Sequence, residues 1–168
     1  MLDTYEGRRA NVIEERIRIL KPELVLDFHT TTAEQPDILI TADRNNEVVQ
    51  RFINASAIKD NLVVSPLNDI TTVAQNFVAY DVSNSHLNDD LYKQICTDIE
   101  RYLDRKVIDQ ERTFYKMIGK ILPEEEQNIA DLKNFAYNDT LQAIPAFLGE
   151  EAYKHDGTYA GFRLEKFS

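Results

Sequence analysis

Helical and strand-like patterns alternate along the first two thirds of this 168-residue sequence. Amphipathic helical spacing is found at residues 4–20, 48–53 and 88–106. Short apolar runs that are typical of buried strands lie at residues 24–28, 37–41, 61–65 and 77–82. Because strands that alternate with helices are joined by crossover connections, this order predicts an α/β fold. Its sheet should be mixed, mostly parallel and sandwiched by helices.

The pattern changes after Val107, where strand-like runs dominate. Strands are predicted at residues 112–121, 144–148 and 159–164, and a turn or first helical turn at residues 122–128. We therefore predict an α/β domain over residues 1–107 and a small C-terminal β-rich subdomain over residues 108–168.

Charge and cysteine content exclude several classes of function. The net charge of −10 argues against nucleic acid and anionic membrane surfaces as partners, since both attract clustered Lys and Arg. No apolar run reaches the roughly 20 residues of a membrane span. The single cysteine, Cys96, rules out an internal disulfide and predicts a cytoplasmic location. Helical spacing predicts that Cys96 is a small core residue beside Tyr92 and Leu103.

The run ELVLDFHTTT (residues 23–32) carries the sharpest chemical candidates. We expect its strand to end near Phe28 and to deliver His29 into a loop, at the edge where α/β sheets bind ligands. Asp27 precedes His29 by two residues, so alternation places both side chains on one face. Imidazole is a common zinc ligand, and a carboxylate often orients it. The alternative is a histidine that hydrogen-bonds only to loop backbone.

Asp81 is the second candidate, because it interrupts an apolar strand run. A buried carboxylate costs free energy unless it is paired. Asp81 is therefore either a general base near His29, where strand ends converge, or a cap for the turn at Ser83 and Asn84. Both interpretations stay open at this stage.

The remaining histidines do not complete a metal site in the sequence. A catalytic zinc needs about three protein ligands and an open position. His86 stands just before a helix start that Asn88 or Asp89 can cap, and there Asp89 more simply acts as a cap or dipole partner than as a metal ligand. His155 lies in turn-like sequence. The acidic segment 150–153 has the composition of a surface turn. Only His29 therefore stands out as a candidate ligand.

Several motifs together resemble the aspartoacylase and succinylglutamate desuccinylase family, which are zinc carboxypeptidase-like amidohydrolases. TYEGRRA (residues 4–10) resembles the family's Y-E-x-R-R-A helix, and LDFHTTT (residues 26–32) resembles its D-L-H-x-T-T strand. Three further segments fall in family order on its T-T-R loop, G-I-E-V-G strand and P-V-F-x-N-E-A-A-Y segment: residues 71–72, 77–83 and 145–153.

The resemblance implies a zinc carboxypeptidase-like fold, a Zn²⁺ cofactor and a small-molecule N-acyl amino acid as substrate. The reaction would cleave an amide to release a carboxylate and an amino acid. By the same resemblance His29 is a metal ligand, Asp27 supports it in the second shell, and Asp81 is the catalytic base. Tyr153 would bind substrate from the C-terminal subdomain.

The sequence also departs from the family pattern. It contains neither the G-x-H-G-N-E segment, which carries the family's first two zinc ligands, nor the D-L-N-R segment. Val73 replaces an arginine that grips the substrate carboxylate, and Asp69 falls near a family tyrosine. Asp81 stands where the family has glutamate. The shorter side chain moves the carboxylate back by roughly 1 Å, and such a misplacement can cost about a hundredfold in rate.

Two hypotheses follow. In one, the chain is the later part of a zinc-dependent N-acyl amino-acid amidohydrolase. In the other, it is a noncatalytic relative that keeps the sheet as a structural or partner-binding domain. If a first βαβ segment is missing from the N-terminal side, a central strand should present an unpaired edge. The chain should then form a homo-oligomer, aggregate or require that segment.

Overall fold

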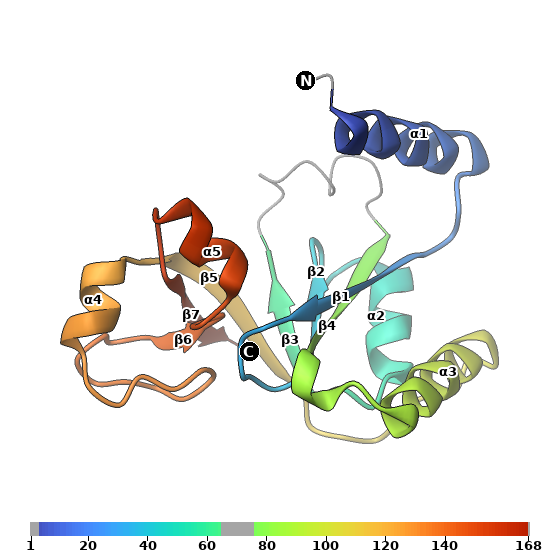
Figure 1. The fold of residues 1–168 in the computed structure, drawn as a ribbon. Coiled ribbons are helices and arrows are strands. Elements are labelled where there is room, and N and C mark those ends of the chain that lie inside the picture. Colours follow the sequence, from blue (N-terminus) through green and yellow to red (C-terminus); the bar gives the residue numbers. More distant parts are fainter. Residues whose placement is uncertain (1–3, 65–75, 168) are drawn as a thin grey trace.

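A computed structural model describes residues 4–64 and 76–167 of the chain (Figure 1). The strands are β1 (Val25–Thr31), β2 (Ile38–Thr41), β3 (Asp60–Val63), β4 (Phe77–Ser83), β5 (Thr113–Ile121), β6 (Ile144–Ala146) and β7 (Gly161–Phe167). The helices are α1 (Tyr5–Leu20), α2 (Glu47–Ala55), the 3₁₀ helix η2 (Asn84–His86), α3 (Asp89–Leu103), α4 (Pro123–Asn128) and α5 (Glu151–Asp156). Among the described helices, none has both the length and the apolar character needed to cross a membrane.

The strands form one sheet in the order β1-β4-β2-β3-β5-β7-β6, which runs from right to left across Figure 1. Between β1 and β5, the β1–β4, β2–β3 and β3–β5 pairs are parallel and only β2–β4 is antiparallel. The β5–β7 and β6–β7 pairs are antiparallel. The predicted mixed, mostly parallel sheet is confirmed for the strands from β1 to β5. The C-terminal strands extend the same sheet, so a boundary near residue 107 stays a prediction.

Different segments cover the two faces of the sheet. Neighbouring residues on a strand point to opposite faces. Leu39 and Tyr80 therefore pack against α2 and α3 in one apolar cluster. Ile38, on the opposite face, packs against C-terminal residues in a second cluster that includes Phe147 and Leu164. The C-terminal third of the chain thus closes the face that α2 and α3 leave uncovered.

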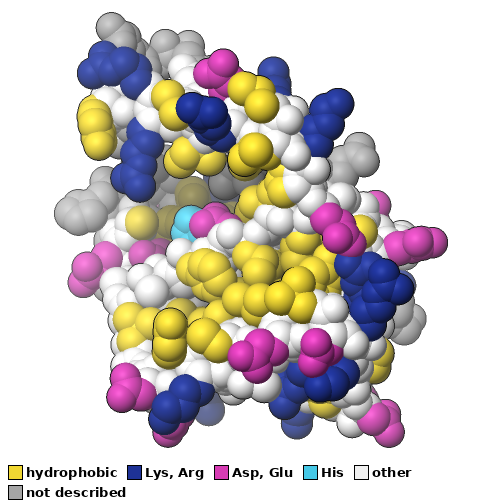
Figure 2. Space-filling model, turned by 90° about the vertical axis from the view of Figure 1, so that its right-hand side faces the viewer, with side chains coloured by type: hydrophobic (Ala, Val, Ile, Leu, Met, Phe, Trp, Pro, Cys, Tyr) yellow, Lys and Arg dark blue, Asp and Glu magenta, His cyan; other side chains and the backbone are white. Residues whose placement is uncertain are grey.

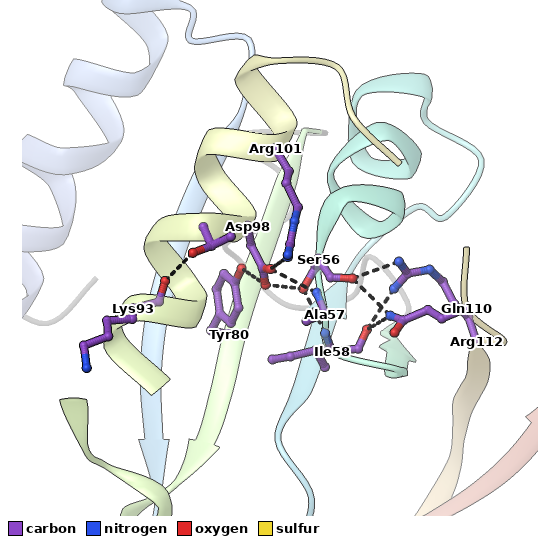
Figure 3. A network of polar contacts seen from close by, with 10 residues as sticks. Ser56, Ala57, Ile58, Tyr80, Lys93, Asp98, Arg101, Gln110 and Arg112 are labelled. Atoms are coloured by element: carbon purple, nitrogen blue, oxygen red, sulfur yellow. Dashed lines mark hydrogen bonds and ion pairs between the residues drawn. The ribbon is translucent and has the colours of Figure 1, made fainter. Parts of the chain in front are cut away.

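A buried carboxylate joins α2, α3 and β4 (Figure 3). Asp98 of α3 is fully buried. It accepts hydrogen bonds from four donors: Ser56 Oγ (2.7 Å), Ala57 N (3.0 Å), Tyr80 Oη (3.1 Å) and Arg101 Nη1 (3.2 Å). Arg112 and Gln110 donate to the backbone carbonyls beside this network. Because its donors come from three elements, Asp98 fixes how the helices sit on the sheet.

The apolar face of α1 is not buried. Its spacing predicts a core-facing row of Ala10, Ile13, Ile17 and Leu20. No described side chain of α1 is buried, and Leu20 is 73% exposed. Figure 1 shows α1 beyond the layers formed by α2, α3 and the sheet. Amphipathic spacing shows that a helix has an apolar face, but it does not show which surface that face packs against.

The core position predicted for Cys96 on α3 is wrong. Cys96 is only half-buried, and its predicted core neighbours Tyr92 and Leu103 are each 71% exposed. The helix buries Leu91, Asp98 and Tyr102. Ile95 and Ile99, which share the predicted apolar spacing with Leu91, pack against the same core.

Candidate functional site

His29 lies inside β1 and not in a loop after it. The strand continues through Thr31, so the predicted end near Phe28 is wrong. The reason is that the β-branched threonines suit an extended backbone. His29 and Asp27 share a face as predicted, and their Nε2 and Oδ2 atoms are 2.6 Å apart. The carboxylate therefore orients the ring, and Nδ1 makes no hydrogen bond to any described residue.

Asp81 of β4 stands directly opposite His29 in the parallel register. Burial raises its pKa to about 6; the charge of His29 opposes this rise, while the charges of Glu150 and Asp37 add to it. Its Oδ1 atom is buried and has no hydrogen-bond partner among the described residues. The turn after β4 forms η2 without a side-chain cap on its first amides. No capping bond from Asp81 is therefore present among the described residues, and its role as a general base stays a prediction.

Glu150 ties the C-terminal part of the chain to the end of β1. Its Oε2 accepts hydrogen bonds from Thr31 Oγ1 (2.5 Å) and Thr32 N (2.8 Å), while Glu151 N donates to Thr32 Oγ1 (2.8 Å). Burial alone would raise the pKa of Glu150, but bonds from Thr31, Thr32 and Ala152 outweigh it and lower the pKa. The composition of this segment predicted a surface turn. The signal for the contact was the run of three threonines, Thr30–Thr32, because their hydroxyls can donate to a carboxylate.

Tyr153 of α5 enters an aromatic cluster beside this contact. Its ring centroid is 4.6 Å from that of Tyr159 and 5.5 Å from that of Phe162. Burial raises the pKa of Tyr153, and the charges of Tyr159, Glu150 and Asp81 raise it further. The phenol therefore stays protonated at neutral pH and lies within the electrostatic reach of Asp81. Its predicted contact with substrate stays a prediction.

Asp37 and His86 lie at ion-pair distance, a contact that was not predicted from the sequence. His86 Nδ1 lies 2.8 Å from Asp37 Oδ1, which also accepts from Ser83 N at 3.3 Å. Of the two predicted caps of α3, Asn88 is the one observed, because its Oδ1 accepts from the amides of Asp90 and Leu91. Asp89 lies in the first turn of the helix. The Asp37–His86 contact stabilises the turn after β4. Other predicted positions lie outside the residues or side chains that the structure describes: Asp69, Thr71, Thr72, Val73 and His155.

The sequence candidates meet on one face of the sheet. We call Asp27, His29, Asp81, Glu150 and Tyr153 the Asp81 cluster. In the described part of the chain, no group of three or more His, Cys, Asp or Glu side chains is placed to hold a metal ion. The residues present therefore do not fit a zinc site by themselves. They offer one oriented imidazole and one half-buried carboxylate with a raised pKa.

Comparison with known proteins gives a match in structure but not in sequence. No family model and no curated protein matches the sequence. The structure of the succinylglutamate desuccinylase from Chromobacterium violaceum superposes with a TM-score of 0.72 at 16% identity, over 99% of this chain and 63% of that protein. The desuccinylase from Vibrio parahaemolyticus gives a TM-score of 0.63 at 12% identity, over 100% of this chain and 62% of that protein.

Murine aminoacylase 3 shares the same fold. Its TM-score is 0.65 at 17% identity, and the match covers 98% of this chain and 71% of that protein. The chain therefore spans between three fifths and three quarters of these enzymes. Nearly the whole chain has the fold of the aspartoacylase and succinylglutamate desuccinylase family, as its motifs predicted.

Proposed function

We propose that this chain has an amidohydrolase-like function, in which the Asp81 cluster cleaves the amide bond of a small N-acyl amino acid. The observation that carries the proposal is the state of Asp81. Its Oδ1 is buried and has no hydrogen bond among the described residues, its pKa is raised to about 6, and it faces His29. A carboxylate with a raised pKa is a stronger base that still ionises at neutral pH.

Asp81 would act first as a base and then as an acid. The ionised carboxylate takes a proton from a water molecule as the water oxygen attacks the acyl carbon. The protonated carboxyl then returns that proton to the amine nitrogen as the carbon–nitrogen bond breaks. Tyr153 keeps its proton because its pKa is raised, so it can donate a hydrogen bond to the substrate. Glu150 holds this segment against β1.

The proposal assigns no step to a metal ion. Zinc is the cofactor that the family resemblance implies, but the described residues supply too few donors to hold it. His29 Nδ1 is one available donor, since Nε2 faces Asp27. Metal content of the purified chain tests this part of the proposal separately from turnover.

The test is hydrolysis of a panel of N-acyl amino acids by the purified chain, with and without added zinc. We expect turnover that Asp81→Asn reduces by about a hundredfold or more, the range for loss of a general base. His29→Ala should also reduce it, because His29 stands opposite Asp81 in the sheet. Asp43→Asn is the matched control, because Asp43 is an exposed turn residue that accepts from Asn45 N. Equal activity in Asp43→Asn and Asp81→Asn would contradict the role of Asp81.

The second candidate function is that of a noncatalytic binding domain. It is favoured by the absence of a metal-holding group among the described side chains. Under this alternative the chain shows no turnover on any substrate of the panel, while it still binds N-acyl amino acids or a protein partner. Calorimetry with the same panel separates the two functions.

A further inference from the structure

The end of β1 and the segment that follows it hold the C-terminal part of the chain through buried polar side chains. Thr31 and Gln35 are 3% and 5% exposed. Thr31 bonds to Glu150 through its hydroxyl. Gln35 reaches the other end of the same turn, where its Oε1 accepts from Phe147 N at 3.0 Å. The two residues thus hold both ends of residues 147–150, the turn that leads into α5.

This turn brings a residue of α5 to the Asp81 cluster. His29 of the cluster is exposed, and Figure 2 shows the molecule from the β1 end of the sheet, where a histidine lies beside an acidic side chain. Tyr153 is carried by α5 and lies close enough to Asp81 for the charge of the carboxylate to act on it. The distance between the phenol and the carboxylate therefore depends on where the turn before α5 is placed.

The backbone of Phe147 has a conformation that costs free energy unless its surroundings hold it. Its φ angle is 60°, in the left-handed region that a bulky side chain rarely adopts. Such conformations persist where the surrounding structure over-determines them, and they gather at functional sites. Here two side-chain amides hold consecutive residues. Gln35 accepts from the Phe147 amide, while Asn134 accepts from Leu148 N at 2.9 Å and donates to Leu148 O at 3.1 Å.

Backbone hydrogen bonds connect Phe147 to Tyr153. Phe147 O accepts from Glu150 N at 3.3 Å, and Glu150 O accepts from Tyr153 N at 3.2 Å. The rings of Phe147 and Tyr153 also belong to the same apolar cluster. A change in the backbone at residue 147 should therefore move the Tyr153 side chain.

We propose that Gln35 is a positioning residue for the amide hydrolysis: by holding the amide of the left-handed Phe147, it sets where the Tyr153 hydroxyl stands relative to Asp81. The inference rests on the proposed function, in which Tyr153 binds the substrate. Only the side-chain oxygen of Gln35 serves this role, because its Nε2 is buried without a hydrogen-bond partner among the described residues. Gln35→Glu therefore keeps the required acceptor, whereas Gln35→Met removes it.

The first test needs no turnover. In Gln35→Met we expect the Phe147 amide to exchange its hydrogen about tenfold faster or more, since it loses its described acceptor. In chains labelled with fluorotyrosine, Tyr153→Phe identifies the fluorine NMR signal of Tyr153. That signal should shift in Gln35→Met and return to the parent position in Gln35→Glu. Gln110→Met is the matched control, because Gln110 Nε2 also bonds to a backbone carbonyl, that of Ser56, but beside the Asp98 network.

The second test is a double-mutant cycle on turnover. Gln35→Met should lower kcat/KM about tenfold in the parent chain and less than about twofold in Tyr153→Phe, because it acts through the tyrosine. A purely structural role would lower both alike, and that result overturns the proposal. An unchanged fluorine signal and unchanged amide exchange in Gln35→Met overturn it as well. A parent chain without turnover contradicts the proposed function, while the fluorine and exchange results still decide whether Gln35 positions Tyr153.

Discussion

Asp98 and Asp81 are two aspartates on opposite faces of the sheet, on either side of β4. Tyr80 of β4 donates to Asp98 on the side of α2 and α3, and the next residue, Asp81, points to the side of His29. Asp98 is fully buried and accepts from four donors. Asp81 has a buried oxygen without a partner among the described residues. The first carboxylate stabilises the fold, whereas the second costs free energy and is available for chemistry.

Removing the satisfied carboxylate should have the largest effect. Asp98→Ala leaves the donors Ser56 Oγ and Tyr80 Oη without their acceptor inside the core. We expect a loss of about 3 kcal/mol in the free energy of unfolding, measured by urea denaturation. Asp90→Ala on the same helix is the control. Its side chain is 93% exposed, and among the described residues it pairs only with Lys93, so about 0.5 kcal/mol is expected. Equal losses would remove the distinction between the two aspartates.

The unsatisfied carboxylate should show the opposite behaviour. Asp81→Asn is expected to reduce amide hydrolysis by about a hundredfold or more. At pH 7 it should leave the free energy of unfolding unchanged or higher, because a neutral amide loses less on burial than a charged carboxylate. The measurement is the rate and the urea midpoint on the same preparations. A variant that loses rate and stability together would place Asp81 with Asp98, as a structural residue.

Glu150 lies between these two extremes. Its carboxylate accepts two bonds from Thr31 and Thr32, and it lies close enough to Asp81 to raise the pKa of that residue. Glu150→Gln should cost about 1 kcal/mol of stability. The neighbouring Glu151 joins this contact through its backbone amide alone, and its side chain is exposed. Glu151→Gln should therefore cost less than half as much. Thermal melts of both variants decide whether the contact orders the segment that carries Tyr153.

Local patterns account for what the sequence predicted well. The Asp27–His29 contact was predictable because strand geometry alone places residues two apart on one face. The strands β2 and β4 were predictable from short apolar runs between polar segments. These features depend on a few neighbouring residues, so no knowledge of the tertiary fold is needed to find them.

Features that depend on distant residues were not predictable in the same way. The Glu150–Thr31 contact joins residues 119 positions apart, and no periodicity encodes it. The burial of Asp98 depends on donors from Ser56 and Tyr80, although composition assigns a charged residue to the surface. The exposed row of α1 depends on a partner that no described element provides. Each of these features therefore depends on contacts between residues far apart in the sequence, which local patterns do not reveal.

The pH dependence of stability is the smallest predicted effect, and it reports directly on the ionisation of Asp81. Its pKa is raised from 3.8 to about 6, so the folded protein binds the proton more tightly than the unfolded chain. The contribution of this group is fully present below pH 4 and is lost as the pH rises through about 6. After discounting for its partial exposure, we expect a loss on the order of 1 kcal/mol.

The measurement must separate Asp81 from Glu150. Glu150 has a lowered pKa, so its contribution to stability is lost as the pH falls. The useful quantity is therefore the difference between the parent chain and Asp81→Asn, measured by urea denaturation from pH 4 to pH 7.5. That difference should grow with pH and level off above about 6.5. A constant difference would mean that Asp81 titrates alike in both states and that its burial does not shift its pKa.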